Sequence, residues 1–336
     1  MCTLPVIVGL DYSDRAVQVC VLDQQGEVVG NRACANTWQA IVEFAESRGR
    51  VVRAAIESCS GAADLADELV TRAGWHVDLA HPGYVARMKQ SPDKTDYQDA
   101  RLIADLERVG YLPRVWLAPE PIRELRRLVR YRQQLVEQRR AVKLRIRALL
   151  REQRCRPPDT LSPWTRAWLS WAEKDAELSA QGQWILARHL QELRRVVDDI
   201  RQAEKRLQEA TTDDPLVASL RQQRGIGPVT AWILRAEIGR FDRFRTGKQL
   251  ARFCGTSPRN ASSGERVADA GLIRAASPTL RAVVIETAHR LIRTDVRWAQ
   301  LAAQLRARGK PACVTVAAVA NRWIRQLYQQ MVEVAA

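Results

Sequence analysis

Two apolar runs that each end on an acidic residue constrain the first part of this chain most strongly. Asp11 closes the run Pro5-Val-Ile-Val-Gly-Leu-Asp11, and Glu57 closes the run Val51-Val-Arg-Ala-Ala-Ile-Glu57. Short continuous apolar runs are typical of buried strands, so each acid is expected at a strand end, where a sheet exposes side chains. The sequence therefore predicts an α/β domain that carries acidic groups at the end of its sheet.

Two further acids, Asp96 and Asp99, lie near the start of the segment Lys94-Thr-Asp-Tyr-Gln-Asp-Ala-Arg101, which we expect to be helical. Their spacing of three residues places both carboxylates on one face of a helix. Four carboxylates brought together repel one another unless a cation neutralises them, and hard oxygen ligands suit Mg²⁺. Each acid alone is equally well explained as a strand-end or helix-surface residue, but the set favours a metal site suited to phosphoryl transfer.

The order of the predicted elements favours one fold. We expect strands at 5–11, 15–23, 27–30, 51–56 and 75–80, and helices at 38–47, 62–73 and 96–109. Three hairpin strands followed by alternating helix and strand is the order of the RNase H-like fold, in which acids at two strand ends meet acids on the last helix. A doubly wound α/β domain is the alternative, but no glycine-rich phosphate loop follows the first strand.

Composition points to a polyanionic partner. The 336 residues, enough for two or more domains, include 53 Lys and Arg against 38 Asp and Glu, a net charge of +15 that favours nucleic acid. A membrane surface is the rival, but no apolar run approaches a membrane span and no signal pattern opens the chain. The seven cysteines and four histidines are scattered, as in a reduced cytoplasmic protein without a zinc site, disulfide frame or Ser-His-Asp triad.

Beyond Pro113 and the Pro119-Glu-Pro121 pair the hydrophobic period changes to seven. The repeating residues are Leu128, Leu135, Val142 and Leu149, then Leu186, Leu193, Ile200 and Leu207. Pro157-Pro158 and a connector rich in tryptophan separate the two series. Two heptad helices around such a break predict either an antiparallel hairpin or a dimeric coiled coil. We expect an RNase H-like domain over 1–115, a coiled-coil domain over 116–212 and a mostly helical domain over 213–336.

Basic residues crowd the first heptad segment and indicate a phosphate-backbone contact, although a solvated helix face is the alternative for most of them. The candidates there are Arg126, Arg127, Arg130, Arg140, Lys143 and Arg147. Further on, Gly225-Ile-Gly227-Pro228 between two amphipathic stretches is typical of a helix-hairpin-helix, whose glycines let backbone N–H groups approach a phosphate. A plain helix–turn–helix corner would also explain it.

The last third contains a Ser262-Ser263-Gly264 loop and apolar helices at 280–291 and 314–331. On the residues alone, Ser263 is best explained as a loop or cap residue. A serine nucleophile needs an activating base, and no histidine lies near it in the sequence.

The chain resembles, over nearly its whole length, the DEDD transposases of insertion-sequence family one-ten, the bridge-RNA-guided recombinases. The matching motifs of the N-terminal half are Gly9-Leu-Asp11, Ile56-Glu57 and Lys94-Thr-Asp96-Tyr-Gln-Asp99-Ala100. Those of the C-terminal half are Gly225-Ile-Gly227-Pro228, Ala236-Glu-Ile-Gly239, Phe241-Asp-Arg-Phe244 to Leu250, Gly255-Thr-Ser-Pro258-Arg259 and Ser262-Ser263-Gly264. One departure is Arg274-Ala-Ala-Ser277, which keeps a positive charge but lacks the family's Gly-Asn turn.

The resemblance implies a RuvC-like domain whose four acids, Asp11, Glu57, Asp96 and Asp99, bind Mg²⁺. It selects Ser263 as the nucleophile of a phosphoserine intermediate, with Arg259 and Arg274 among the nucleic-acid contacts. It also implies target and donor DNA paired to a structured non-coding guide RNA, and a homo-oligomer, a dimer or a tetramer on DNA, whose sites combine acids and serine from different protomers.

Two other functions stay open at this point. One is a RuvC-like metal-dependent nuclease or Holliday-junction resolvase that uses water, with Ser263 inert. The other is a non-catalytic basic coiled-coil protein that binds RNA or DNA.

Overall fold

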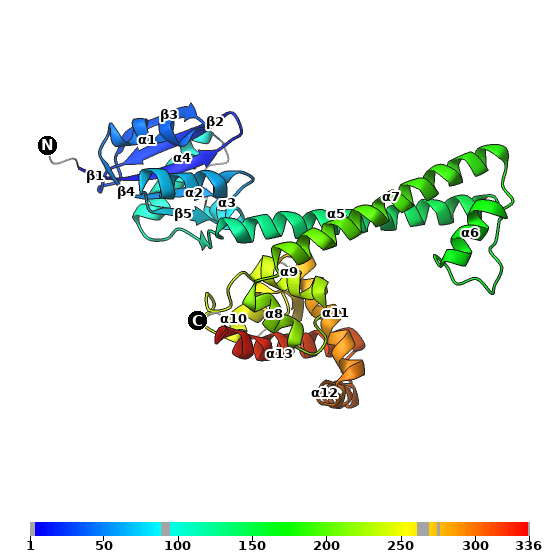
Figure 1. Cartoon of the computed structure of the whole chain (residues 1–336). Helices are drawn as coiled ribbons and strands as arrows, with labels where there is room; N and C mark the ends of the chain where they lie inside the picture. The colour runs from blue at the N-terminus through cyan, green and yellow to red at the C-terminus, as the bar shows by residue number, and fades with distance from the viewer. Residues whose placement is uncertain (1–3, 89–94, 261–268, 274–275, 335–336) are drawn as a thin grey trace. The chain divides into compact units, whose positions relative to one another are not determined.

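The computed structural model describes residues 4–88, 95–260, 269–273 and 276–334 and divides into two compact units, Met1–Glu120 and Pro121–Ala336 (Figure 1). Ser263 and Arg274, together with Ser262 and Lys94, lie outside the described residues. Among the described helices, none combines the length and the apolar character that crossing a bilayer requires.

A six-stranded mixed sheet organises the N-terminal unit, in the order β3-β2-β1-β4-β5-β6. The strands are β1 (Pro5–Tyr12), β2 (Ala16–Leu22), β3 (Val28–Ala35), β4 (Arg50–Glu57), β5 (Val77–Ala80) and β6 (Arg114–Val115). The first three pair antiparallel, β4 lies parallel to β1, and β5 lies parallel to β4. The expected α/β character and strand order are confirmed, and the sheet is consistent with an RNase H-like fold.

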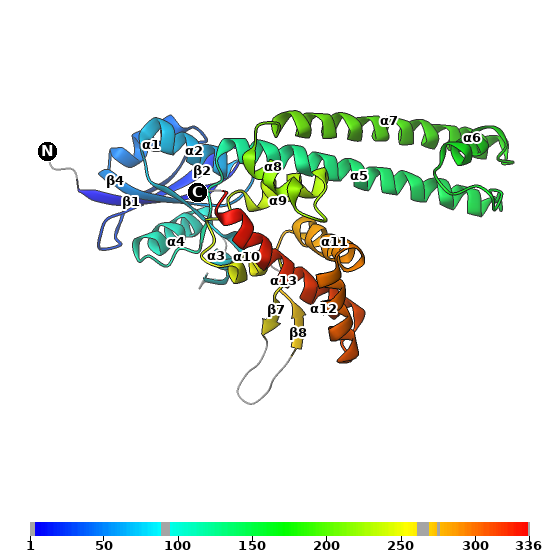
Figure 2. The ribbon, with the colours of Figure 1, turned by 60° about the horizontal axis from the view of Figure 1, so that its bottom comes forward.

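Helices cover both faces of this sheet, which explains the nearly continuous apolar strands. On one face, α1 (Trp38–Glu46) and α2 (Ala62–Ala73) bury alternate residues of the strands, such as Val8, Leu10 and Val19. On the other face lies α4 (Asp96–Arg108), packed on Cys20 and Leu22 of β2. Figure 2 shows α1 and α2 on one side of the strands and α4 on the other. A short helix, α3 (Pro82–Met88), follows β5.

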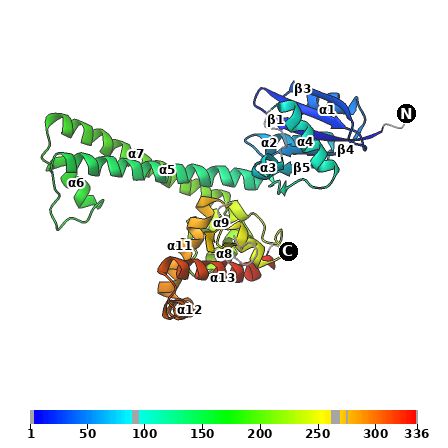
Figure 3. The same ribbon diagram turned by 180° about the vertical axis from the view of Figure 1, so that it is seen from behind.

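The second unit begins with a helical hairpin, so the two long helices pair within one chain. The helices are α5 (Glu120–Glu152) and α7 (Ala180–Ala210), with α6 (Arg166–Lys174) between them. They run antiparallel, because Arg132 pairs with Glu204 at 2.7 Å while Arg145 pairs with Glu192 at 3.3 Å. Figures 1 and 3 show the two helices side by side.

The heptad seam is buried as expected in α7 but shifts at both ends of α5. Leu135 and Val142 are buried, whereas Val129 replaces Leu128 and Leu150 replaces Leu149 as the buried position. The reason is a change of packing partner along α5. Near its start the helix contributes to the C-terminal core, and near its end it packs on the tryptophans around α6.

Six helices and a small hairpin complete the described part of this unit. They are α8 (Pro215–Gln222), α9 (Pro228–Ile238), α10 (Gly247–Phe253), β7 (Pro258–Asn260), β8 (Asp269–Leu272), α11 (Pro278–Thr294), α12 (Val296–Ala307) and α13 (Ala312–Val332). Leu125, Val129 and Leu207 from the hairpin share their core. The sequence analysis did not foresee α12, whose start is capped by the Asp295 carboxylate, which accepts from the backbone N–H of Arg297 at 3.0 Å.

Candidate active site and nucleic-acid interface

Asp11 and Glu57 lie at the carboxyl ends of two adjacent parallel strands. In the register between β1 and β4, Leu10 lies opposite Ile56, so the next residue of each strand is the acid. Both acids are half-buried. The carboxyl ends of parallel strands are where side chains leave the packed part of a sheet, and the sequence had predicted both positions.

Gly9 determines how closely α4 approaches this end of the sheet. A Cβ atom at Gly9 would overlap the backbone of α4 at Ala100 and Ala104, so the helix lies directly on the strand. Successive side chains of a strand point to opposite faces, and Asp11 therefore faces the same side as Gly9, toward α4.

Glu57 faces α4 as well. Ala55, two residues earlier on β4, shares a buried cluster with Ile103 of α4. Arg53, two residues earlier again, forms a 3.2 Å ion pair with Glu107, whose side chain is fully buried at the far end of α4. The side chains at 53, 55 and 57 alternate onto one face, so Glu57 also lies on the helix-covered side.

These contacts also give the direction of α4. Glu107 lies beside the first half of β4, whereas Ala100 lies beside Gly9, close to the end of β1. The helix therefore runs against both strands, and its first turn, with Asp96 and Asp99, lies at the edge that carries the strand-end acids. Asp99 is 7% exposed and Asp96 is exposed.

A hydrogen-bond chain fixes the first turn of α4 to the sheet. Gln18, opposite Asp11 in the register of β1 and β2, donates to Asn31 Oδ1 at 2.7 Å, and Asn31 donates to the backbone carbonyl of Tyr97 at 3.1 Å. Tyr97 lies between the two helical acids. The sequence analysis missed Gln18 and Asn31, since their role depends on two strand pairings and one helix.

The edge of the sheet that carries Asp11, Glu57 and the first turn of α4, here called the acid edge, raises the pKa of a neighbouring thiol. Burial raises the pKa of the Cys59 thiol, and the negative charges of Glu57, Asp11 and Asp14 raise it further. Three carboxylates therefore act on one point of the edge. Cys59 and Asp14 are additional residues of this region that the sequence analysis did not single out.

The acid edge fits a hard cation by its donor chemistry, because all of its candidate ligands are carboxylate oxygens. Their side chains are not drawn together as in a loaded site. In the described part of the chain, no three His, Cys, Asp or Glu side chains are close enough to hold one ion.

Two predicted nucleic-acid contacts lie at the end of α9. Arg126 Nε donates to the carbonyl of Ala236 at 2.6 Å, and burial lowers the pKa of its guanidinium. Arg130 Nε lies 3.6 Å from Glu237 Oε1. Arg243 donates to the same helix end, at the carbonyl of Ile238. Cations at a helix C-terminus satisfy its last carbonyls, so Arg126 has a role inside the fold.

The remaining basic candidates of α5 lie on its surface. Arg127 pairs with Glu124 on the same helix, and Arg140 is exposed. Lys143 and Arg147 flank the ring of Trp164, with Lys143 Nζ 4.7 Å from its centroid. Burial, followed by the neighbouring arginines 139 and 147, lowers the pKa of Lys143. A basic group over an aromatic ring is a common element of nucleic-acid surfaces.

A cavity of about 840 Å³ continues this surface at the end of α5. Four arginines and no acid line it among the described residues: Arg147, Arg151, Arg154 and Arg156. Trp168 also lines it and is 2% exposed, and its Nε1 has no acceptor within the described chain. A phosphate oxygen would satisfy both donor types. The sequence analysis missed Arg151, Arg154 and Arg156. Their signal was the basic segment 151–156, which reads Arg-Glu-Gln-Arg-Cys-Arg and directly precedes Pro157-Pro158.

The turn of the predicted helix-hairpin-helix connects α8 to α9, an arrangement that a plain helix–turn–helix corner shares. Gly225 has a left-handed backbone, φ 83°, and its carbonyl accepts from Arg290 Nε at 3.2 Å. Ile226 is buried, and Gly227 precedes Pro228 at the start of α9 with open space around its α-carbon. The geometry permits a phosphate to approach the N–H groups there. Arg259 is exposed on β7.

The sheet order is consistent with an RNase H-like fold, and comparison with protein families identifies the class of the chain as transposases with a DEDD domain. A family model described as "Transposase" matches residues 8–154 and contains all four predicted acids. A second, described as "Transposase IS116/IS110/IS902 family", matches residues 217–304 and contains Ser263. The chain belongs to this family of insertion-sequence transposases, and DNA is therefore its substrate.

Proteins from several bacteria are similar along most of the chain. A "Probable family 20 transposase" of Pseudomonas aeruginosa is 29% identical over 331 residues, 96% of this chain and 95% of that protein. The "Transposase for insertion sequence element IS1111A" of Coxiella burnetii is 26% identical over 93% of this chain and 86% of its own length. The "Transposase for insertion sequence element IS1328" of Yersinia enterocolitica is 25% identical over 70% of this chain and 69% of its own length.

Proposed function

We propose that this transposase cuts and rejoins DNA strands through a phosphoserine intermediate and is guided by a structured non-coding RNA. The observation that supports the cutting chemistry best is the common location of four acids. Asp11 and Glu57 end adjacent strands, and Asp96 and Asp99 occupy the helix turn that lies over the same edge. A purely structural explanation would not require three separate elements, β1, β4 and α4, to carry acids to the same edge of the sheet.

In the proposed reaction, Ser263 Oγ attacks the phosphorus of a DNA phosphodiester and loses its proton. The bond between phosphorus and one ester oxygen breaks, and that oxygen leaves as a hydroxyl after taking up a proton. A hydroxyl end from another strand then attacks the phosphoserine and releases the serine. The phosphodiester number is unchanged, so rejoining needs no external energy source.

Mg²⁺ fits the donor chemistry of the acid edge, and Asp11, Glu57, Asp96 and Asp99 are the residues that would hold it. When bound, it would stabilise negative charge on the phosphoryl oxygens. The contribution of the chain itself is to orient these carboxylates. Gly9 allows α4 to lie on the strand, and the Gln18–Asn31 pair holds the helix turn through the Tyr97 carbonyl.

The guide RNA is supported by the resemblance and by the basic helical hairpin, and the oligomer is supported by the resemblance alone. RNA and target and donor DNA all present phosphates, and the surface around Arg140, Lys143 and Arg147 suits them. We propose a dimer, or a tetramer on DNA, in which the acids of one protomer act with Ser263 of another.

A test on purified protein with its guide RNA separates the proposal from a simple nuclease. Ser263→Ala should abolish the covalent protein–DNA adduct, while Ser262→Ala should keep it. Glu57→Gln should abolish strand cleavage with the fold unchanged, and the exposed Glu68→Gln on α2 is its matched control. Cleavage by Ser263→Ala without an adduct would instead identify a water-using RuvC-like nuclease.

The shared site has its own test. Glu57→Gln and Ser263→Ala proteins, each inactive alone, should recover part of the activity when they are mixed. Mixed oligomers that form without recovering any activity would show that acids and serine act within one protomer.

A further inference from the structure

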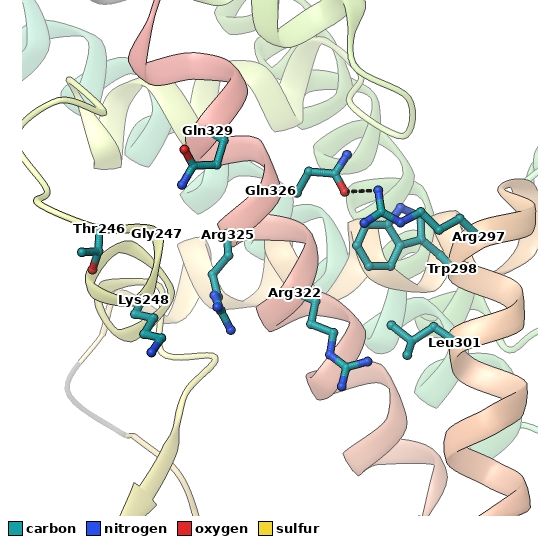
Figure 4. A pocket seen from close by; sticks show the side chains of 10 residues that line it. All are labelled: Thr246, Gly247, Lys248, Arg297, Trp298, Leu301, Arg322, Arg325, Gln326 and Gln329. Atoms are coloured by element: carbon teal, nitrogen blue, oxygen red, sulfur yellow. Dashed lines mark hydrogen bonds between the residues drawn. The ribbon is translucent and has the colours of Figure 1, made fainter.

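A second basic site lies in the C-terminal unit, on elements other than the two long helices of the hairpin. It is a cavity of about 730 Å³ between α10, α12 and α13 (Figure 4). Four of its lining residues are cationic: Lys248, Arg297, Arg322 and Arg325. No aspartate or glutamate lines it in the part of the chain that the structure describes. An uncompensated group of positive charges is unfavourable unless an anion joins it.

One wall of this cavity is well defined. Arg297 Nη1 donates to Gln326 Oε1 at 2.7 Å, and its guanidinium carbon lies 5.0 Å from the ring centroid of Trp298. Trp298 itself is 5% exposed and belongs to the core of the unit. Arg297 is therefore positioned by neighbours on two helices, while its charge remains without a carboxylate partner among the described residues.

The opposite wall depends on a close helix contact. A Cβ at Gly247 would lie 3.0 Å from the carbonyl oxygen of Arg325, so α10 starts directly against α13. This approach brings Lys248 beside Arg325. Figure 4 shows Arg325 between Lys248 and Arg322, with the three side chains extending toward the same side. All three are exposed, and no ion pair within the described chain engages them.

We infer that this cavity binds the sugar–phosphate backbone of a nucleic-acid strand, a contact that rests on the proposed function and extends it to a second site. Arg322 and Arg325 are three residues apart, roughly 4.5 Å along the helix axis. One strand of a duplex carries a phosphate every ~3.4 Å of axis, so the two arginines can contact consecutive phosphates. The cavity is larger than a single phosphate requires, and the Gln326 and Gln329 amides can hydrogen-bond to the sugar and phosphate oxygens.

The site is also tied to the β7–β8 hairpin. Asn321, one residue before Arg322 on α13, donates to the backbone carbonyl of Thr256 at 3.2 Å and lies 3.4 Å from Ser257 Oγ. These two residues lead directly into β7. A backbone held in the cavity would therefore keep a fixed distance from the start of that hairpin. Phosphate contacts of this kind position a strand without reading its sequence.

The test compares two double variants with the same change in charge. Arg322→Glu/Arg325→Glu alters the cavity, whereas Arg306→Glu/Arg308→Glu alters exposed residues of α12 and its end that do not line it. Binding of a random-sequence DNA duplex and of a structured RNA is titrated by fluorescence anisotropy at several salt concentrations. The cavity variant should bind at least about tenfold more weakly than the control variant. For the duplex, its slope of log affinity against log salt should fall by roughly 0.9 for each lost contact.

The outcomes are distinct. A loss confined to DNA or to RNA identifies which strand occupies the cavity and supports the site. Equal losses in the two double variants overturn the site and leave the proposed cutting chemistry standing. Wild-type protein that binds through the cavity but never forms a serine adduct would contradict the proposed function alone. Lys248→Glu changes the cavity from α10 and should also weaken binding relative to the control variant. An unchanged thermal unfolding curve shows that each variant is folded.

Discussion

The close packing of α4 on Gly9 gives a sharp prediction for Gly9→Ala. The added methyl would lie 2.8 Å from Ala104 Cβ, where ordinary contacts begin at 3.4 Å, and nearer still to two backbone atoms of α4. Backbone atoms cannot rotate away, so the helix must move by more than half an ångström. Overpacking of this kind costs about 1–3 kcal/mol, a fall of roughly 5–15 °C in the melting temperature of a unit of this size.

The same shift should also lower the rate of strand cleavage. It would move the turn that carries Asp96 and Asp99 away from the strand-end acids. Misplacement by about 1 Å can cost roughly a hundredfold in rate, so strand cleavage should fall by about tenfold to a hundredfold. The assays are thermal unfolding by circular dichroism and cleavage of a labelled duplex under single-turnover conditions.

Gly74→Ala is the matched control in the same unit. Gly74 has φ 70° and no atom within 4 Å of the added methyl, so the change strains only the backbone, by about 1–2 kcal/mol. It should lower stability and leave cleavage at the wild-type rate in the folded protein. Wild-type activity in Gly9→Ala, or equal loss in both variants, would refute the view that α4 positions the acids.

Two further tests address the acids and the arginines. Glu57→Gln should speed alkylation of Cys59 relative to Cys313, which is exposed like Cys59, because losing a nearby negative charge lowers the raised pKa of the Cys59 thiol and increases its thiolate fraction. Saturating Mg²⁺ should speed the same alkylation in the wild-type protein, and a rate that Mg²⁺ leaves unchanged would argue against a cation at this edge. Arg126→Ala should lower the free energy of unfolding of the C-terminal unit by about 1–3 kcal/mol in urea unfolding, because carbonyls of α9 lose a charged donor. Arg140→Ala should change that free energy by less than about 0.5 kcal/mol but weaken RNA and DNA binding measured by fluorescence anisotropy.

The parts of the fold that the sequence predicted are those with strong local patterns. The run that ends at Asp11 is apolar on both sides because helices cover both faces of the sheet, and such runs are recognisable without any partner. The start of α4 also has a local cause, because Thr95 caps the helix by accepting from the backbone N–H of Gln98. Local chemistry determined these elements, so the positions of the four acids followed from them.

The missed features depend on contacts between distant segments. In α12 only Trp298 and Ala302 are buried, too few for a hydrophobic period, and its cap at Asp295 was the one local signal. The role of Arg126 depends on a carbonyl 110 residues away. The cavity beside Arg322 and Arg325 needs three helices from different parts of the C-terminal unit. The spacing of residues within a single segment does not predict such contacts between distant segments.

The antiparallel pairing of α5 and α7 also sets a length. The 33 residues of α5 rise ~1.5 Å each, so the arm measures roughly 50 Å, or about 15 base pairs of duplex. One extra heptad in each helix would keep the same seam and lengthen the arm by roughly 10 Å, about three base pairs. Related transposases could thus change the spacing that the arm spans in steps of a heptad, while every packing contact at its two ends stays the same.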